Sequence, residues 1–331
     1  MKIAFVTEMD FRGKVPANHP NMRTEFAWMH ALDADHYNIW HSIAEFSLKD
    51  YDHVFLIFPK GRLNLNAIGD KISNQENPYS KLMETEWWEI MKSRNKRLHF
   101  VQEGPHWLWN DYELADQINF INMMQVCDSI FVHNESDVNY YKGFFRHKPI
   151  HVLPSLMIDT LIKDIEPKPE DKVFVGGNFA RWYGGFESYI VAEEFNVERW
   201  GQESHAKRPG EDQLLKHLPR LMWKDWMKEL STFKYAVHLM PTVAAGTFGL
   251  NCAYFGIPCV GNVKVDTQRL CHPLTSVDVD NVDRAKQIAA RLAKDQDFYN
   301  TCSKEAKRVA HETYSVAYWK NYMNNILNEK K

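Results

Sequence analysis

Short apolar runs alternate with longer segments of helical periodicity along almost the whole chain. In the first half, the apolar runs predict strands at Lys2–Thr7, His36–His41, His53–Pro59, Arg97–Gln102, Asp128–His133 and Ile150–Leu153. The spacing between them predicts helices at Thr24–Leu32, Lys81–Ser93 and Tyr112–Val126. Strands that are apolar at nearly every position are buried on both faces, so the pattern indicates a parallel sheet covered by helices.

A charged stretch with two prolines, residues 163–172, predicts a linker before a second alternation. Beyond it, strands are predicted at Lys172–Gly176, Asn196–Gly201, Tyr235–Met240, Ile257–Gly261 and Leu274–Asp278. A helical segment with mixed charge then runs from Val282 to about Leu327. The expected fold class is α/β, with two Rossmann-like domains facing each other across a cleft at the carboxyl ends of their strands.

Composition supports this division and narrows the class of protein. A chain of 331 residues exceeds what one hydrophobic core usually holds, and 44% apolar with 25% charged residues is typical of a globular protein. No apolar run is long enough to span a membrane, and no signal peptide is visible, so a cytoplasmic location is expected. The five cysteines form no CxxC pair and the fifteen histidines no HExxH pair, so no dedicated metal site is predicted.

The most informative motif is a paired-glycine turn after the first strand of the second half, residues 175–181 (VGGNFAR). Glycines let the backbone approach a ligand closely, and free N–H groups at a helix start favour phosphate. Arg181 would add charge-assisted hydrogen bonds. The motif predicts a phosphate site at Gly176, Gly177, Asn178 and Arg181. The alternative is an ordinary tight turn with a surface arginine.

A second glycine cluster, residues 246–251 (GTFGLN), opens a short helix that ends at the Gly-Ile-Pro turn 256–258. The start of such a helix suits a diphosphate, which predicts that Thr247 and Phe248 contact it. Asn251, one turn further on, would face a ribose. The alternative is a helix–strand unit without a ligand.

A carboxylate, Glu103, follows the strand predicted at Arg97–Gln102. Catalytic groups of open α/β sheets lie at such strand ends, and a carboxyl group with a raised pKa can act as a general base. His106 and Trp107 come next and could wall the same site. The alternative is that Glu103 caps the following helix.

Basic residues gather near several strand ends with no acidic residue between them. They could form a rim that contacts DNA phosphates, in which case binding would weaken steeply with salt. A solvated surface is the alternative. The net charge of −3 argues against a generally basic nucleic-acid coat but allows such a local rim. The rim residues are Lys60, Arg62, Arg94, Lys96, Lys142, Arg146 and Lys148.

Together these motifs resemble the GT-B glycosyltransferases, in which two Rossmann-like domains hold a nucleotide-sugar mainly in the second. The resemblance sharpens toward the DNA β-glucosyltransferases of T-even bacteriophages in residues 48–54 (LKDYDHV), 96–103 (KRLHFVQE) and 175–179 (VGGNF). It implies an acceptor-binding domain at 1–160 and a nucleotide-sugar-binding domain at 161–310. A C-terminal helix at 311–331 would return to the first domain.

The resemblance also implies roles for single residues. Glu103 stands where the family has a catalytic aspartate, and Glu25 is similar to a glutamate that contacts the sugar. Trp200 and Gly201 take the place of a Phe-Gly turn near the uracil. In many GT-B enzymes a glutamate binds the ribose, and here Asn251 replaces it.

The resemblance therefore predicts an inverting, UDP-sugar-dependent glycosyltransferase with Glu103 as the base. Its acceptor would be the hydroxyl of a 5-hydroxymethylpyrimidine in double-stranded phage DNA, flipped out of the duplex, and its sugar glucose or a pentose such as arabinose. A monomer in the host cytoplasm without membrane contact is expected, and Mg or Mn could assist departure of UDP. Two alternatives stay open: a polysaccharide, lipid or protein acceptor, and a nucleotide-sugar-binding module without catalysis.

Overall fold

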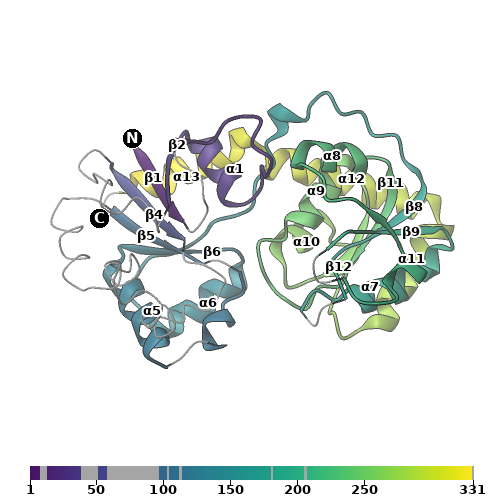
Figure 1. Cartoon of the computed structure of the whole chain (residues 1–331), viewed down its shortest axis with the longest axis horizontal. Coiled ribbons are helices and arrows are strands. Elements are labelled where there is room, and N and C mark those ends of the chain that lie inside the picture. Colours follow the sequence, from purple (N-terminus) through teal and green to yellow (C-terminus); the bar gives the residue numbers. More distant parts are fainter. Residues whose placement is uncertain are drawn as a thin grey trace. The chain divides into compact units, whose positions relative to one another are not determined.

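The computed structural model describes residues 1–7, 13–38, 51–57, 97–102, 104–111, 114–179, 182–204 and 207–329. Contacts divide the chain into two compact units (Figure 1). Unit 1 comprises Met1–Ala17 and Met29–Leu153, and unit 2 comprises Asn18–Trp28 and Pro154–Lys331. No helix in the described ranges is long and apolar enough to cross a membrane.

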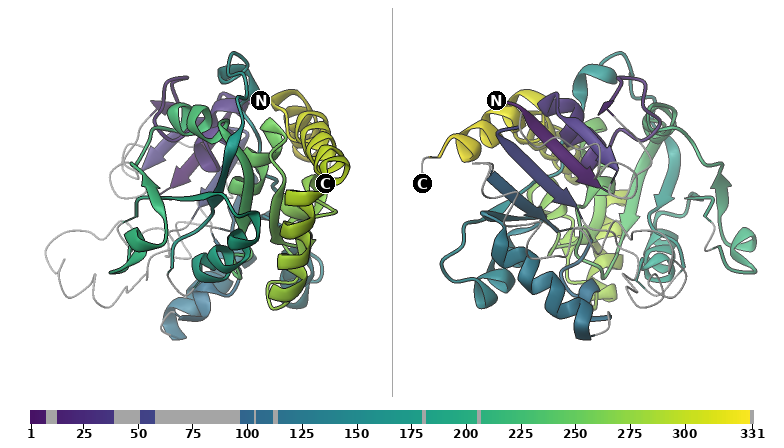
Figure 2. Two further views of the ribbon diagram at one scale, coloured as in Figure 1. Left: turned by 90° about the vertical axis from the view of Figure 1, so that its right-hand side faces the viewer. Right: turned by 60° about the vertical axis from the view of Figure 1, so that its left-hand side comes forward.

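Unit 1 is built on one sheet. Its strands are β1 (Ile3–Thr7), β2 (Gly13–Lys14), β3 (Asp35–Asn38), β4 (His53–Ile57), β5 (Arg97–Val101), β6 (Ser129–Val132) and β7 (Ile150–Val152). They lie in the order β2-β3-β1-β4-β5-β6-β7, and every neighbouring pair is parallel except β2 and β3. Figure 2 shows the arrows of the first strands, coloured purple to blue, side by side. Strands β1 and β4 are buried at every position, as a sheet covered on both faces requires.

Helices pack one face of this sheet into a core. The helices of unit 1 are α1 (Glu25–Leu32, shared with unit 2), η2 (Leu108–Asp111), α5 (Leu114–Val126) and α6 (Glu135–Phe144). Phe120 and Met124 of α5 and Tyr141 of α6 are buried against alternate strand residues such as Val54 and Phe100. This alternation places the remaining strand residues on the opposite face.

The opposite face carries aromatic rings and a buried polar chain. The rings of Phe5 and Phe55 stack with their centroids 4.7 Å apart. His53 Nδ1 lies 2.8 Å from His99 Nε2, and His99 Nδ1 lies 2.7 Å from Ser129 Oγ. Burial lowers the pKa of His53 to about 4 and that of His99 well below its ordinary value. Both rings are therefore uncharged in the folded protein at neutral pH.

Unit 2 contains a second, wholly parallel sheet. Its strands are β8 (Glu170–Val175), β9 (Glu198–Gln202), β10 (Lys216–Leu218), β11 (Phe233–His238), β12 (Cys259–Asn262) and β13 (Ser276–Val277). They lie in the order β10-β9-β8-β11-β12-β13. The two parallel α/β sheets confirm the predicted fold class.

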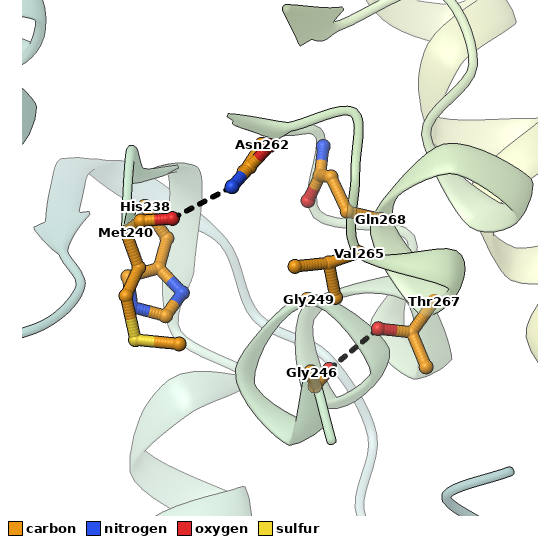
Figure 3. A pocket seen from close by; sticks show the side chains of 8 residues that line it. All are labelled: His238, Met240, Gly246, Gly249, Asn262, Val265, Thr267 and Gln268. Carbon is orange, nitrogen blue, oxygen red and sulfur yellow. Dashed lines mark hydrogen bonds between the residues drawn. The ribbon is translucent and has the colours of Figure 1, made fainter. Parts of the chain in front are cut away.

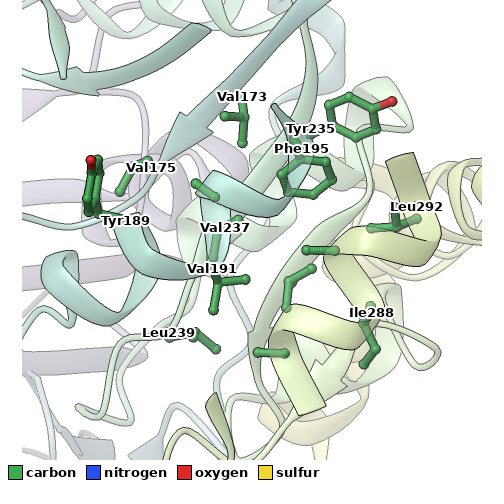
Figure 4. Packing of buried hydrophobic residues seen from close by; sticks show 14 of the residues in the cluster. Val173, Val175, Tyr189, Val191, Phe195, Tyr235, Val237, Leu239, Ile288 and Leu292 are labelled. Carbon is green, nitrogen blue, oxygen red and sulfur yellow. The ribbon is translucent and has the colours of Figure 1, made fainter. Parts of the chain in front are cut away.

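Helices cover both faces of this second sheet. The described helices of unit 2 are α7 (Gly185–Ala192), α8 (Trp223–Leu230), α9 (Thr247–Phe255), α10 (Asp266–Cys271), α11 (Val282–Lys294), α12 (Gln296–Thr313) and α13 (Val316–Asn328), with short η3 (Asp159–Leu161), η4 (Glu193–Phe195) and η5 (Glu211–Gln213). Val173 and Val237 of the sheet pack with Val191 of α7 and Ile288 of α11 (Figure 4). On the other face, Phe174 contacts rings from α8 and α9.

The predicted linear pattern holds for most elements. The strands expected in each half are present, and the helices expected at Thr24–Leu32 and Tyr112–Val126 are confirmed as α1 and α5. The helix expected at Lys81–Ser93 lies outside the described residues. The sequence did not predict β2 or β10. The segment from Val282 forms three helices because side chains at Asp295 and Ser315 start new ones.

The observed units differ from the expected boundaries at residues 160 and 310. Residues 18–28, from the N-terminal half, are grouped with unit 2: Trp223 N–H donates to Pro20 O at 2.7 Å, and Trp28 Nε1 donates to Pro154 O at 3.1 Å. Trp319 Nε1 of α13 donates to the same Pro154 carbonyl at 2.9 Å. Helix α13 is grouped with unit 2, and its return to the N-terminal domain stays a prediction.

Candidate functional site

The carboxyl edge of the unit 2 sheet brings several predicted site residues together. Strands β8, β11 and β12 are neighbours and run in parallel, so the loops that follow them leave the sheet at one edge. These loops lead into α7, α9 and α10. Both glycine clusters predicted to bind phosphate therefore lie at this edge.

The paired glycines form a tight turn whose sterics exclude larger residues. A Cβ at Gly176 would come within 2.8 Å of the His238 ring, and one at Gly177 would lie 2.3 Å from Tyr183 O. Gly177 also has a φ of +78°, which favours glycine. The turn closes where Gly185 N–H donates to Asn178 O at 3.1 Å. Gly177 is exposed and Asn178 partly exposed, so the turn presents backbone to a ligand.

The helices that begin at this edge have uncapped N-termini. Their N-cap residues are Gly184 for α7, Gly246 for α9 and Val265 for α10, and none of these three residues caps its helix with a side-chain hydrogen bond. By contrast, Asn281 and Asp295 cap α11 and α12 with their own side chains. Free N–H groups and the positive end of the helix dipole favour an anion, so this edge suits a diphosphate.

Side chains of β12 and α10 hold the loops of this edge in place (Figure 3). Thr267 Oγ1 donates to Gly246 O at 2.7 Å, which fixes the left-handed residue that starts α9. Asn262 Nδ2 donates to Met240 O at 2.9 Å, and Gln268 Nε2 donates to Cys259 O at 2.8 Å. They border a small pocket lined by His238, Met240, Gly246, Gly249, Asn262, Val265, Thr267 and Gln268.

His238, the last residue of β11, lies between the two glycine clusters. Its ring packs on Gly176 and makes an edge contact with Phe248 of α9, with centroids 4.9 Å apart. Burial lowers its pKa to about 4, so the imidazole is uncharged at neutral pH. Neither His238 nor Asn262 was predicted from the sequence. A polar residue at the carboxyl end of a buried parallel strand was the signal that could have found both.

Trp200 lies elsewhere on unit 2. Its ring faces Phe233, its Nε1 donates to Glu198 Oε2 at 2.6 Å, and Lys172 Nζ lies 5.8 Å from its centroid. In the sheet, Lys172 of β8 lies opposite Glu198 of β9, near the starts of both strands. The Trp200 ring contacts these two residues and so points away from the carboxyl edge. Gly201 is buried against Leu215. The structure does not bring the Trp200 ring together with the glycine turns.

Asn251 is buried within unit 2. Its amide Oδ1 accepts from Trp226 Nε1 at 3.3 Å, and its Nδ2 donates to Thr247 O at 3.2 Å. The side chain is 5% exposed. Both the oxygen and the nitrogen of the Asn251 amide are hydrogen-bonded to protein groups. A contact with a ribose would therefore require Asn251 to give up these hydrogen bonds. Thr247 and Phe248 are partly exposed at the start of α9, as a phosphate contact requires.

Unit 1 presents a histidine at the carboxyl edge of its own sheet. His106 follows β5, and its Nδ1 lies 2.9 Å from Oδ1 of the fully buried Asp137. Its ring also packs on Tyr140, with centroids 4.2 Å apart. Trp107 beside it is partly exposed. The predicted base Glu103 lies outside the described residues, as does Arg181 of unit 2.

The remaining predicted contacts are dispersed. Glu25 begins α1, is 5% exposed and accepts from Thr24 Oγ1. Lys142 and Arg146 are exposed at the far end of α6, beside the amino end of β7 and opposite the carboxyl edge. Lys148 Nζ donates to the carbonyl of Gln125 at 3.1 Å and so caps α5. The other rim residues, Lys60, Arg62, Arg94 and Lys96, lie outside the described residues.

Metal ligands do not cluster in the part of the chain that the structure describes. There, no group of three or more His, Cys, Asp or Glu side chains could hold an ion. The five cysteines are all buried as free thiols. The geometry of the site therefore rests on backbone N–H groups and neutral polar side chains.

Comparison with solved structures identifies the architecture. Anabaena HepE in complex with UDP matches with a TM-score of 0.64 and 11% identity over 99% of both chains. An alpha-glucosyltransferase in complex with UDP and a 13-mer DNA containing an HMU base matches with a TM-score of 0.64 and 10% identity over 99% of this chain and 100% of that chain. The chain has the GT-B fold.

A longer protein shares the fold. A mutant of S. aureus TarM in complex with Fondaparinux, alpha-GlcNAc-glycerol and UDP matches with a TM-score of 0.61 and 12% identity over 88% of this chain. The chain spans 58% of the length of TarM. No family model and no curated protein sequence matches the chain. At these identities the likeness to solved structures establishes the fold.

The comparison corrects the family resemblance drawn from the sequence. The matching structures include an alpha-glucosyltransferase in complex with UDP and DNA, where the sequence motifs had suggested the β-glucosyltransferases. The short runs quoted for the β enzymes, such as residues 175–179, describe a glycine turn that several nucleotide-binding folds could share. A glycine turn has the same steric requirements in the alpha- and the β-glucosyltransferases, so it cannot distinguish the two families.

Proposed function

We propose that the protein is a UDP-sugar-dependent glycosyltransferase that acts on the hydroxyl of a 5-hydroxymethylpyrimidine in DNA. The observation that carries the proposal is the meeting of two glycine clusters and three uncapped helix starts at one edge of unit 2. Such an edge suits a diphosphate, and GT-B structures with UDP bound share the fold of this chain. The fold itself is compatible with many acceptors.

The donor would bind through its diphosphate. Backbone N–H groups of Gly177 and Asn178 and of the first turn of α9, Thr247 and Phe248, would donate to the phosphate oxygens. Arg181 would add a positive charge. As the bond between the sugar and the phosphate breaks, negative charge grows on UDP, and these fixed donors would stabilise it. A divalent cation, if bound to the diphosphate, would supply further charge compensation.

The acceptor would be held by unit 1. His106 and Trp107 follow β5 at the carboxyl edge of its sheet, and His106 is oriented there by Asp137. Glu103 precedes them in the sequence. The alpha-glucosyltransferase that shares the fold over the whole chain was solved with DNA containing an HMU base, which supports a hydroxymethylated pyrimidine as the target. A base of this kind must leave the helical stack to be modified.

The same comparison supports a proposal for the stereochemical outcome. UDP-glucose carries its sugar in α linkage, so an alpha-glucosyltransferase retains the configuration of the anomeric carbon. We therefore propose retention, in place of the inversion that the resemblance to β enzymes implied. In a retaining transfer Glu103 would orient the acceptor hydroxyl and would not have to act as the base on the face opposite UDP.

One experiment tests the proposal. The full chain is incubated with UDP-glucose or a UDP-pentose and with DNA that does or does not contain 5-hydroxymethylcytosine or 5-hydroxymethyluracil. UDP release and mass spectrometry of the nucleosides are then measured. Sugar on the modified base alone is expected. Turnover only with a polysaccharide, lipid or protein would show that DNA is not the acceptor. UDP binding without any turnover would indicate a nucleotide-sugar-binding module.

A further inference from the structure

One polar side chain at the carboxyl edge of unit 2 packs against its neighbours without a hydrogen bond to the residues that the structure describes. His238 reaches between the turn at Gly176 and the first turn of α9, touching both. Neither of its ring nitrogens hydrogen-bonds to any residue in the described ranges, whereas its pocket neighbours Asn262, Thr267 and Gln268 all do. Figure 3 shows its ring on the side of the pocket opposite Thr267 and Gln268.

A buried histidine of the same unit, His272, provides the contrast. His272 Nε2 donates to Gly249 O at 2.9 Å, and its Nδ1 accepts from Cys259 N–H at 3.4 Å. Both nitrogens of His272 are thus used to join α9 to β12. His238 makes no such bond, although it lies closer to the two segments that suit phosphate. The His238 side chain is partly exposed and lines the pocket, so its ring nitrogens are accessible to a partner that enters there.

We propose that His238 is a donor-binding residue that donates a hydrogen bond from its neutral ring to the diphosphate, between the Gly177–Asn178 turn and the start of α9. The inference rests on the proposed function. A neutral imidazole has one N–H donor and one acceptor nitrogen, so it can bind a phosphate oxygen without adding charge. Burial keeps the ring in this form, since its pKa is lowered to about 4.

The position of the ring favours the diphosphate over the other parts of the donor. Gly176 precedes the exposed backbone of Gly177, and Phe248 belongs to the uncapped first turn of α9. A group held against both contacts the two places where phosphate oxygens would accept hydrogen bonds. A contact to the sugar would instead require the ring to point away from these turns.

The test compares two histidine-to-phenylalanine variants of the full chain. His238→Phe keeps a flat ring against Gly176 and removes both nitrogens, and His272→Phe is the matched control. Dissociation constants for UDP, without any sugar, are measured by calorimetry, together with melting temperatures. For His238→Phe we expect a UDP dissociation constant raised about tenfold or more and an unchanged melting temperature, because a bond to a charged group is lost but no protein bond is. For His272→Phe we expect the reverse.

A further variant separates loss of the hydrogen bond from a change of shape. His238→Asn retains an N–H donor in a smaller side chain and should recover part of the lost UDP affinity. An affinity of His238→Phe for UDP within twofold of the wild type would overturn the inference. Weaker binding of the UDP-sugar with unchanged binding of UDP would overturn it too. Failure of the proposed function has a different signature, since the wild-type protein itself would then not bind UDP.

Discussion

The imidazole of His238 lies directly on the backbone of Gly176, where a Cβ would come within 2.8 Å of ring atoms Cγ and Cδ2. This contact explains the first glycine of the pair, while the positive φ of Gly177 explains the second. The two glycines therefore serve different ends: one makes room for a neighbouring ring, and the other turns the chain.

Gly176→Ala is expected to displace the His238 ring and to weaken both stability and donor binding. Overpacking of this kind typically costs about 1–3 kcal/mol. Chemical unfolding gives the free energy of unfolding, and calorimetry gives the affinity for UDP.

The control is Gly143→Ala in α6, where nothing lies within 4 Å of an added Cβ. An alanine inside a helix is preferred to glycine by up to about 1 kcal/mol, so this variant should be as stable as the wild type or more so. If Gly176→Ala proved equally harmless, the close contact with His238 would not exist in solution.

Thr267→Val is expected to raise the KM for the sugar donor severalfold with a loss of stability of only about 1 kcal/mol. The hydroxyl of Thr267 holds the carbonyl of Gly246, and this bond fixes the direction of the first turn of α9. Thr267→Ser keeps the hydroxyl and should restore the wild-type KM. Equal KM values for the valine and serine variants would show that this hydrogen bond does not orient the helix start.

Acid should destabilise the fold through buried histidines before it protonates most carboxylates. His53, His238 and His272 have pKa values lowered to about 4 by burial, while in the unfolded chain a histidine titrates near 6.5. Below about pH 6.5 the unfolded state therefore binds protons that the folded state does not. Stability is complete above pH 6.5 and falls toward pH 4, by about 1.4 kcal/mol per pH unit for each fully unprotonated ring.

Urea unfolding at pH 7.5, 6 and 5 measures this slope. The urea concentration at the unfolding midpoint should fall with each decrease in pH. It should fall less in His53→Gln, because the glutamine side chain does not titrate. A free energy of unfolding that is the same at pH 7.5 and pH 5 would contradict uncharged burial of these rings.

The product of glucose transfer is expected to be an α-glucoside, and the coupling of its anomeric proton in an NMR spectrum decides this. Glu103→Gln should then slow transfer by weakening the orientation of the acceptor while UDP affinity stays nearly unchanged. A β-glucoside, together with complete loss of transfer in Glu103→Gln, would restore inversion with Glu103 as the general base.

The sequence predicted those parts of the site that depend on local sterics. The Gly176–Gly177 turn and the glycine start of α9 were found because positive φ and close backbone approach restrict the residue type at the position itself. Likewise, the buried strands of both sheets follow from their apolar runs. These features are local, so a single sequence reveals them.

The orientation of other predicted site residues depends on packing against residues that are distant in the sequence. Asn251 was expected to face a ribose, yet Trp226 from another helix pairs with its amide. The ring of Trp200 turns toward Lys172 and Phe233, which lie near the starts of neighbouring strands. Neither partner is near in sequence, so periodicity alone could not show which way these side chains point.

The placement of residues 18–28 has a consequence for how the chain can be made and divided. These residues are synthesised early, but Pro20 accepts from Trp223, and Trp28 bonds to Pro154, both far downstream. A fragment that begins at Pro154 would lack this early segment, and a nascent chain must extend past Trp223 before the segment finds all its partners. Unit 2 therefore consists of segments that are synthesised early and late, and no single cut of the chain yields it whole.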